Sequence, residues 1–379
     1  MTPLERALSH IDTQRLDKLL IDAVSVYSPT WAEAPAVDVF VRFLDTHGVP
    51  YTLQPVTAKD SPNRRENILI QIGPQPNRIL WLGHTDTVVL PDDELLEPSV
   101  EDGTLYGLGS ADMKSGCAAA VEAATAIVKA GIELRGGLSI ALVVGEEEYG
   151  DGCEAIPDSA LAPVAVVGEP TNLTPCTEHF GYLETELKAR GSRAHAAIPE
   201  HGANAIHAML GWLTSVLETR RTGEDPVIYN PRGIKGASPL FAVPEKCKAT
   251  LDAHVPADTP IRQVRDTIDR ARELALATHG GCKLSWKEEF WAPGYRLDND
   301  DPDLAAVRRS FRQVGRTFRT SRFRSHSDAA ALAARGVKPI VCGPGRLEVA
   351  HTPNEQVDLE DVHEAARLYT AMFLSACLE

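Results

Sequence analysis

Residues 80–88 read Leu80-Trp81-Leu82-Gly83-His84-Thr85-Asp86-Thr87-Val88, an apolar run that ends on a histidine. The run predicts a β-strand with His84 at its carboxyl end, and Asp86 follows two residues later. A carboxylate there can hold the second ring nitrogen of the imidazole, which is the arrangement that a metal-binding histidine needs. Taken alone, the segment is more typical of a histidine at a surface turn.

Three more apolar runs share this pattern, because each is short, rich in β-forming residues and followed by glycine and polar residues. Ligands of open α/β sheets collect in the crevice outside the carboxyl ends of the strands. We therefore expect four strand ends to converge on one cleft that contains two histidines and several acids. The runs are 138–144 before Gly145-Glu146-Glu147-Glu148, 163–167 before Gly168-Glu169, and 337–342 before Gly343-Pro344-Gly345 and His351.

Asp112 lies in the glycine-rich segment 107–116, which precedes the alanine-rich run 117–130. That run favours a helix, and Gly131 stands where a helix commonly ends. An aspartate at a helix N-terminus is typically a cap. In a cleft built from the strand ends, Asp112 could instead bridge two metal ions, and the local sequence leaves both interpretations open.

Taken together, these residues resemble the dinuclear zinc aminoacylase and carboxypeptidase family. That family includes acetylornithine deacetylase, succinyl-diaminopimelate desuccinylase and glutamate carboxypeptidase. The motifs occur in the family's order and the resemblance covers nearly the whole chain. They are His84-x-Asp86-x-Val88, Gly107-x-Gly109-x-x-Asp112-Met113-Lys114, Glu147-Glu148-x-Gly150, Gly168-Glu169-Pro170-Thr171, and Gly343-Pro344-Gly345 followed by Ala350-His351-Thr352.

The resemblance implies two divalent metal ions, for which we expect zinc, with cobalt or manganese as alternatives. It places His84 and Glu169 on one ion, Glu148 and His351 on the other, and Asp112 between them. Imidazole nitrogen and carboxylate oxygen are suitable zinc ligands. Three carboxylates against two dications leave a formal charge of about +1, which favours a hydroxide held between the ions.

Glu147 is the general base in this resemblance, and it would pass the water proton to the leaving amine. The three consecutive glutamates leave the register open, since Glu146 and Glu147 could be the base and the ligand instead. We favour Glu147 and Glu148 because Gly150 stands two places after Glu148. Asp86 is expected to hydrogen-bond the ring of His84 and fix its tautomer.

His195 lies in the polar segment 191–199, ahead of a predicted helix. By itself, such a histidine is typical of a surface loop. The segment is similar to the family's lid motif, whose histidine reaches into the partner subunit's cleft to stabilise the oxyanion. The resemblance therefore implies that His195 is catalytic and that the protein is a homodimer.

Composition excludes several other classes of protein. The net charge of −15 argues against nucleic-acid binding, which needs a basic face. No run approaches the roughly 18 apolar residues of a membrane span, and the N-terminus lacks a signal sequence. The seven cysteines have no close paired spacing, so we expect them to be reduced. We expect a cytoplasmic enzyme with a small-molecule substrate and no membrane partner.

A chain of 379 residues predicts two domains. Residues 1–177 alternate amphipathic helix and apolar strand, which indicates an α/β domain with a mixed, mostly parallel sheet flanked by helices. Residues 178–293 contain strands with one wet face and two helical segments, at residues 204–219 and 261–278, as in an α+β sandwich with an antiparallel sheet. The resemblance makes this insertion the lid and dimerisation domain, after which residues 294–379 complete the catalytic domain. Residues 226–244 are expected to form an exposed loop.

The sequence departs from the family where substrate would bind. His254 replaces the arginine that usually stands two residues before the proline of the lid strand, and the asparagine usually found before Val243-Pro244 is missing. His326 stands where glycine or threonine is common. A guanidinium binds a carboxylate through two fixed donors, which a histidine cannot reproduce. The candidate substrate contacts are His254, Arg322, Arg324, His326, Gly345 and Arg346.

The sequence thus predicts a metal-dependent hydrolase that cleaves the amide bond of an N-acyl amino acid or a short peptide. The missing arginine keeps open a hydrolase of an unusual carbon–nitrogen bond on the same dinuclear site. A catalytically silent metal-binding or interaction protein is a third alternative, against which the intact ligand set and Glu147 argue.

Overall fold

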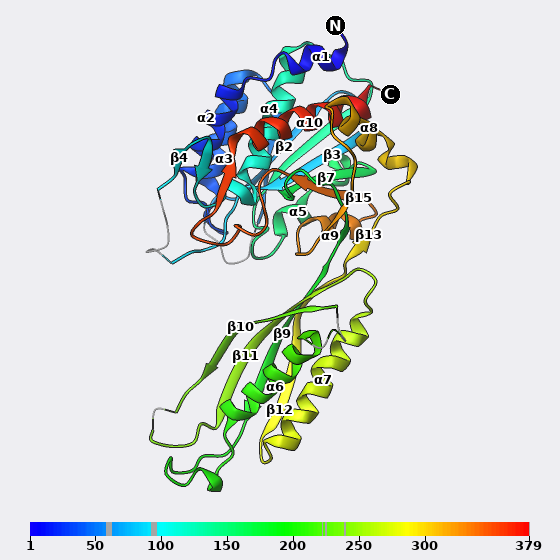
Figure 1. Cartoon of the computed structure of the whole chain (residues 1–379). Helices are drawn as coiled ribbons and strands as arrows, with labels where there is room; N and C mark the ends of the chain where they lie inside the picture. Colours follow the sequence, from blue (N-terminus) through cyan, green and yellow to red (C-terminus); the bar gives the residue numbers. More distant parts are fainter. Residues whose placement is uncertain (58–62, 92–96, 222, 224–225, 239, 379) are drawn as a thin grey trace. The chain divides into compact units, whose positions relative to one another are not determined.

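The computed structural model describes residues 1–57, 63–91, 97–221, 223, 226–238 and 240–378 (Figure 1). The chain divides into two compact units. Unit 1 comprises residues 1–177, 297–323 and 327–379, and unit 2 comprises residues 178–296 and 324–326. Each unit has its own hydrophobic core. The chain leaves unit 1 after Thr177 and returns to it at Leu297.

Unit 1 is built on a mixed sheet with the strand order β1-β2-β6-β3-β7-β15-β8. Its centre is parallel, because β6, β3, β7 and β15 run in the same direction. The outer pairs β1–β2, β2–β6 and β15–β8 are antiparallel. The predicted mixed, mostly parallel sheet is therefore confirmed. The strands are β1 (Tyr51–Pro55), β2 (Glu66–Ile72), β3 (Asn77–His84), β6 (Gly137–Val143), β7 (Val164–Pro170), β8 (Cys176–His179) and β15 (Lys338–Gly343).

Continuous apolar sequence explains the parallel centre of this sheet. Every residue of β6 and of β7 is buried, as expected of strands covered on both faces. Trp81 of β3 is fully buried and packs edge-on against Tyr369 of the last helix. A small second sheet has the order β16-β5-β4. The remaining strands of unit 1 are β4 (Ser99–Glu101), β5 (Thr104–Tyr106), β14 (Ser321–Phe323) and β16 (Gln356–Asp358).

Helices flank the sheet (Figure 1). The alanine-rich run forms α4, which packs against β3, β7 and α10. α3 packs on β2, and α9 packs on β15. None of the helices in the described ranges combines the length and the apolar character that a bilayer span requires. The helices of unit 1 are α1 (Pro3–Leu8), α2 (Thr13–Val24), α3 (Ala34–His47), α4 (Ser115–Lys129), α5 (Asp151–Ala155), α8 (Ala305–Gln313), α9 (Ala329–Ala334) and α10 (Leu359–Cys377).

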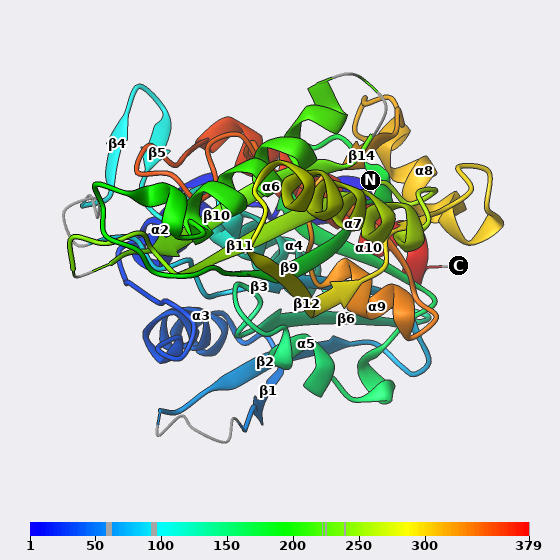
Figure 2. The ribbon, with the colours of Figure 1, turned by 90° about the horizontal axis from the view of Figure 1, so that it is seen from below.

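Unit 2 is an antiparallel sheet with the order β10-β11-β9-β12. Two helices, α6 and α7, pack side by side against it (Figures 1 and 2). β9 alternates buried and half-buried residues, which is the pattern of a strand with one covered face. The elements are β9 (Gly181–Arg190), α6 (Ala205–Arg221), β10 (Ile228–Gly236), β11 (Lys246–Val255), α7 (Ile261–Thr278), β12 (Lys283–Ala292) and β13 (Tyr295–Arg296).

β10 differs from the exposed loop expected at residues 226–244. Ile228–Gly236 pairs with β11 as an edge strand, with a register shift between Pro231 and Gly233. Proline cannot donate to a sheet ladder, so it is tolerated at an edge or at a bulge. The expectation was wrong about the strand because proline and glycine at an edge do not break pairing as they would inside a sheet.

Candidate metal centre

The parallel strands bring the predicted ligands to one edge of the sheet in unit 1. His84 is the last residue of β3, and Glu169 lies near the end of the neighbouring β7. Glu146 and Glu147 follow β6, which pairs with β3 up to His84. Gly168 permits close packing beneath Glu169, because a Cβ there would lie 2.3 Å from the Trp81 ring.

The first group of ligands consists of His84, Asp112 and Glu169, all of them buried. His84 Nε2 lies 3.2 Å from Oδ1 of Asp112 and 3.9 Å from Oε1 of Glu169. One ligand atom from each residue lies within 4.8 Å of the others. Such a cluster of imidazole and carboxylate groups can hold a divalent cation.

The second group consists of Asp112, Glu147 and His351. His351 Nε2 lies 3.3 Å from Oδ2 of Asp112 and 3.1 Å from Oε2 of Glu147. Asp112 therefore directs one carboxylate oxygen toward each histidine. The His351 side chain is 53% exposed, whereas those of His84 and Asp112 are 2% and 8% exposed.

The electrostatics of this centre indicate a deficit of positive charge. Burial raises the pKa of the Glu169 carboxyl well above its ordinary value, and the nearby charge of Asp112 adds to the rise. Burial opposes protonation of His351, but its hydrogen bonds to Asp112 and Glu147 outweigh that effect and raise its pKa to about 11. Within the described part of the chain, the ion pairs of Asp112, Glu147 and Glu169 go to His84 and His351. Divalent cations would neutralise these acids, so the residues fit the two metal ions that the resemblance implies.

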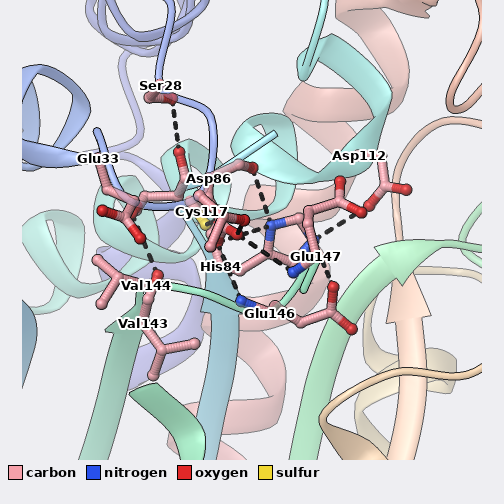
Figure 3. A network of polar contacts seen from close by, with 12 residues as sticks. Ser28, Glu33, His84, Asp86, Asp112, Cys117, Val143, Val144, Glu146 and Glu147 are labelled. Carbon is pink, nitrogen blue, oxygen red and sulfur yellow. Dashed lines mark hydrogen bonds and ion pairs between the residues drawn. The ribbon is translucent and has the colours of Figure 1, made fainter. Parts of the chain in front are cut away.

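Glu146 lies beside His84 and Glu147 belongs to the second group, whereas Glu148 joins neither group and is exposed. Glu146 Oε2 lies 3.9 Å from His84 Nε2, and its side chain is 12% exposed (Figure 3). This placement differs from the favoured register, with Glu147 as base and Glu148 as ligand. It corresponds to the alternative register, shifted by one residue. The turn at Gly145–Gly150 is responsible, because it directs Glu148 and Tyr149 outward.

Asp86 is fully buried, and it contacts both His84 and the glutamate loop. His84 Nδ1 lies 3.0 Å from the backbone oxygen of Asp86 and 3.6 Å from its Oδ1. The carboxylate accepts hydrogen bonds from the backbone N–H groups of Glu146 and Glu147 (Figure 3). The nearer contact to the imidazole is thus made by the main chain of Asp86 rather than by its side chain.

Glu355 is a buried residue of this region that the sequence reasoning missed. Its carboxylate accepts backbone hydrogen bonds from Gly109, Ala111 and Asp112 at 2.8 to 2.9 Å. It thereby fixes the segment that carries the shared ligand. Its position shortly after His351 was the available signal, but the local sequence does not distinguish Glu355 from the surface acids of the following helix.

The remaining predicted residues belong to neither ligand group. His195 is exposed in a loop of unit 2, where its Nδ1 accepts a hydrogen bond from the backbone N–H of Ala197 at 3.1 Å. His254 and His326 each lie within 6 Å of the ring of Tyr182 in unit 2, at 5.3 and 5.8 Å between centroids. Gly345 is buried in unit 1. Exposed arginines are Arg322 and Arg346 in unit 1 and Arg324 in unit 2.

Comparison with known proteins gives matches along most of the chain. Residues 80–375 match the model of the peptidase family M20/M25/M40. A probable carboxypeptidase of Aspergillus terreus is 28% identical over an alignment of 382 positions, which covers 94% of this chain and 85% of that protein. The acetylornithine deacetylase of Proteus mirabilis is 25% identical over an alignment of 358 positions, which covers 90% of each chain. A tripeptidase structure from Staphylococcus aureus has the same fold, with a TM-score of 0.78, 19% identity, and coverage of 97% of this chain and 99% of that one.

Proposed function

Because the chain belongs to the peptidase family M20/M25/M40, we propose that it hydrolyses the amide bond of an N-acyl amino acid or a short peptide. The family and its deacetylase relatives identify a metallohydrolase that acts on amide bonds. Acyl amino acids and peptides are the substrate classes suggested by the names of the deacetylase, carboxypeptidase and tripeptidase relatives.

One observation carries the proposal. The two carboxylate oxygens of Asp112 face two different histidines, at 3.2 and 3.3 Å. A bridging carboxylate between two three-residue groups is what a pair of divalent cations would require. We therefore assign His84, Asp112 and Glu169 to one cation and Asp112, Glu147 and His351 to the other. Zinc is the cation we expect from the donor types.

Glu146 takes the role of general base in this proposal. It belongs to neither ligand group and lies beside His84. Burial raises the pKa of Glu146 well above its ordinary value; His84 opposes the rise and Asp328 adds to it. A carboxylate with a raised pKa is a more effective base. Bound cations would supply polarisation of the scissile carbonyl and a more acidic water. Glu146 would accept the water proton and deliver it to the leaving nitrogen.

Metal stripping and reloading tests the proposed activity. The purified protein would be treated with a chelator and reloaded with zinc, cobalt or manganese. Each form would be assayed with N-acetyl, N-succinyl and N-formyl amino acids and with dipeptides. We expect hydrolysis that is lost on stripping and restored by at least one metal, with Asp112→Ala as the inactive control. Metal-independent hydrolysis, or none with any of these substrates, would contradict the proposal.

The proposal retains His195 as an oxyanion-stabilising residue that acts across a homodimer, because the segment 191–199 is similar to the lid motif. Its exposed position in unit 2 is compatible with contact to a second subunit. Mixing inactive His195→Ala subunits with inactive Glu146→Gln subunits tests this role. Half of the exchanged dimers would be mixed with one complete site each, so about a quarter of the wild-type activity should return. Verified subunit exchange without recovery would refute action in trans.

A second candidate is hydrolysis of another carbon–nitrogen bond, in a substrate that lacks a free α-carboxylate. The observation that favours it is the lowered pKa of the His254 and His326 side chains. Burial lowers the pKa of His326 to about 4, and repulsion from His254 contributes. Burial also lowers the pKa of His254. Both side chains are therefore neutral at physiological pH and provide no fixed cation for a carboxylate.

A further inference from the structure

The loop that carries Glu146 and Glu147 is held at its entry by Asn67 of β2. The backbone ladder between β2 and β6 ends at the pair Ile68 and Leu142. Beyond it, Asn67 Oδ1 accepts a hydrogen bond from the Val144 N–H at 3.2 Å, and Nδ2 donates to the Gly152 oxygen at 2.8 Å. One buried side chain therefore ties together the two ends of the segment 144–152.

Arg65 holds the exit of the same loop. Its guanidinium donates to both carboxylate oxygens of Asp151, the first residue of α5, with Nη2 2.9 Å from Oδ1. It also pairs with Glu33 just before α3, with Nε 3.0 Å and Nη2 2.9 Å from Oε1. The side chains of Arg65 and Glu33 are 1% and 0% exposed. Arg65 thus connects the loop to a fixed, buried anchor.

Packing reinforces this connection. The Arg65 guanidinium lies 4.4 Å from the centre of the Trp31 ring, and that ring lies 5.0 Å from the ring of Tyr149 in the loop. Gly145 has φ +79°, and a Cβ there would lie 2.2 Å from Asp151 Oδ1 and 2.3 Å from Arg65 Nη2. The ion pair therefore lies directly against the first residue of the loop. A displacement of Arg65 would therefore disturb the chain before the two glutamates, at Gly145, and after them, at Asp151.

We infer that Arg65 is a positioning residue for the reaction, because it fixes the loop that places Glu146 beside His84 and carries the candidate ligand Glu147. This inference rests on the proposed function. Arg65 does not touch the ligand groups itself, and it acts through Asp151 and the turn between Gly145 and Gly150. That turn is closed by hydrogen bonds from the N–H groups of Tyr149 and Gly150 to the Gly145 oxygen at 3.0 and 2.8 Å.

A purely structural role for Arg65 makes a different prediction. Breaking a buried ion pair between a guanidinium and a carboxylate strongly destabilises a protein, wherever the pair lies in the fold. The chain offers a matched control in Arg15, whose Nε lies 2.8 Å from the buried Glu122 of α4. Arg15 also makes a second bond to that carboxylate, and its other polar contacts in the described part of the chain go to His10 and Asp12, outside the glutamate loop. Loss of either arginine removes a buried ion pair, but only loss of Arg65 releases the loop.

The first experiment compares Arg65→Met with Arg15→Met, both loaded with metal and assayed well below their melting temperatures. We expect both variants to melt at a lower temperature. For Arg65→Met, kcat should fall by about ten- to a hundredfold, the scale of a misplacement of roughly 1 Å. KM should change less than about threefold, because ground-state binding is untouched. Arg15→Met should keep kcat within about twofold of the wild type. Equal kcat values in the two variants would overturn the inference.

Asp151 provides a second test if Arg65→Met does not fold, since its side chain is 25% exposed and its loss leaves the Arg65–Glu33 pair in place. Asp151→Ala should lower kcat, and the conservative Asp151→Asn should recover much of it by retaining one acceptor for Arg65. Wild-type kcat in Asp151→Ala would refute the inference.

Hydrogen exchange measured by mass spectrometry supplies a readout that needs no substrate. Peptides that contain residues 145–151 should exchange faster in Arg65→Met and Asp151→Ala than in the wild type, and unchanged in Arg15→Met. Unaltered exchange in all variants would overturn the positioning role even if the enzyme were active. A wild-type protein without amide hydrolysis would instead refute the proposed function and leave the exchange comparison to decide the role of Arg65 in holding the loop.

Discussion

The backbone N–H of Glu147 donates a hydrogen bond to Oδ2 of Asp86 over 3.1 Å. Asp86 also accepts a bond from Glu146 N–H at 3.3 Å, and its backbone oxygen faces Nδ1 of His84. One residue therefore links a histidine ligand to the loop that carries the proposed base and a carboxylate ligand. The contact to the imidazole comes from the main chain and would remain after substitution of the side chain, so loss of the carboxylate should act through the loop.

Asp86→Ala removes the acceptor of the Glu146 and Glu147 N–H groups and should lower metal affinity or kcat by about 10- to 100-fold, which is the usual effect of removing a group that orients a metal ligand, here Glu147. Thr30→Val is the matched control. Thr30 donates a hydrogen bond to the same carboxylate at 2.8 Å, and its loss leaves the bonds from the loop intact. Metal titration and steady-state kinetics measure both effects. Equal losses in the two variants would contradict the special role of Asp86.

Asp112→Ala should release both cations, because this carboxylate is shared by the two ligand groups. Glu148→Gln should retain two equivalents, since Glu148 is exposed and joins neither group. Plasma spectrometry of the purified variants measures metal per chain. Two equivalents retained in Asp112→Ala would refute the bridging assignment.

Glu146→Gln and Glu147→Gln separate the two registers of the glutamate loop. Glu146→Gln should keep both metals while kcat falls by at least about a hundredfold, the usual scale of general acid-base catalysis. Glu147→Gln should weaken one metal, because its Oε2 lies beside His351. If Glu147→Gln kept both metals and Glu148→Gln lost one, the register would move forward by one residue.

Acidification should destabilise the protein in the window between about pH 6.5 and pH 4, through His179 at the end of β8 and His326. Burial and repulsion from His326 lower the pKa of His179 to about 3, while burial and His254 lower that of His326 to about 4. The unfolded chain binds more protons than the folded chain between these values and the ordinary histidine pKa, so stability falls as pH falls. His326→Phe preserves an aromatic ring beside Tyr182 and removes one titrating group. The melting temperature of this variant should therefore fall less between pH 7 and pH 4 than that of the wild type. An equal fall in both proteins would contradict the assignment.

Substrate choice should reflect the imidazole at residue 254. A pocket without a fixed cation leaves no buried charge unpaired when the substrate carboxylate is masked. We expect kcat/KM for a free acid and for its amide to agree within about tenfold, or roughly 1.4 kcal/mol. His254→Arg should widen the ratio in favour of the free acid. A wild-type preference of a thousandfold for the free acid would mean that another cation, such as Arg322, Arg324 or Arg346, binds it.

The sequence was sufficient to predict the sheet and to indicate that His84, Asp112, Glu169 and His351 would lie close together, because these features depend on local patterns. Apolar runs without alternation are typical of parallel strands, and residues 80–84 of the run that ends on His84 lie in β3. The helix expected at residues 261–278 has those bounds in the structure. Because parallel strands end at the same edge of a sheet, strand direction alone then predicts that residues far apart in the sequence lie close together.

The remaining features depend on contacts that local sequence does not encode. The register of Glu146, Glu147 and Glu148 is set by a turn whose N–H groups bond to Asp86, sixty residues away. Glu355 acts through backbone groups of the segment around Asp112, which carry no side-chain signal. β10 was missed because pairing with β11 outweighs the local effect of Pro231 and Gly233.

The position of β15 has a consequence for the order in which the protein forms during synthesis. β15 lies between β7 and β8 in the sheet of unit 1, yet it follows both segments of unit 2 in the chain. The ribosome therefore completes residues 178–296, with their own hydrophobic core, before it delivers the strand that fills this gap. Domains generally fold as units as they emerge. The inserted unit can thus fold while the sheet of unit 1 still lacks β15. The candidate metal centre is assembled only after residues 338–351 have been synthesised.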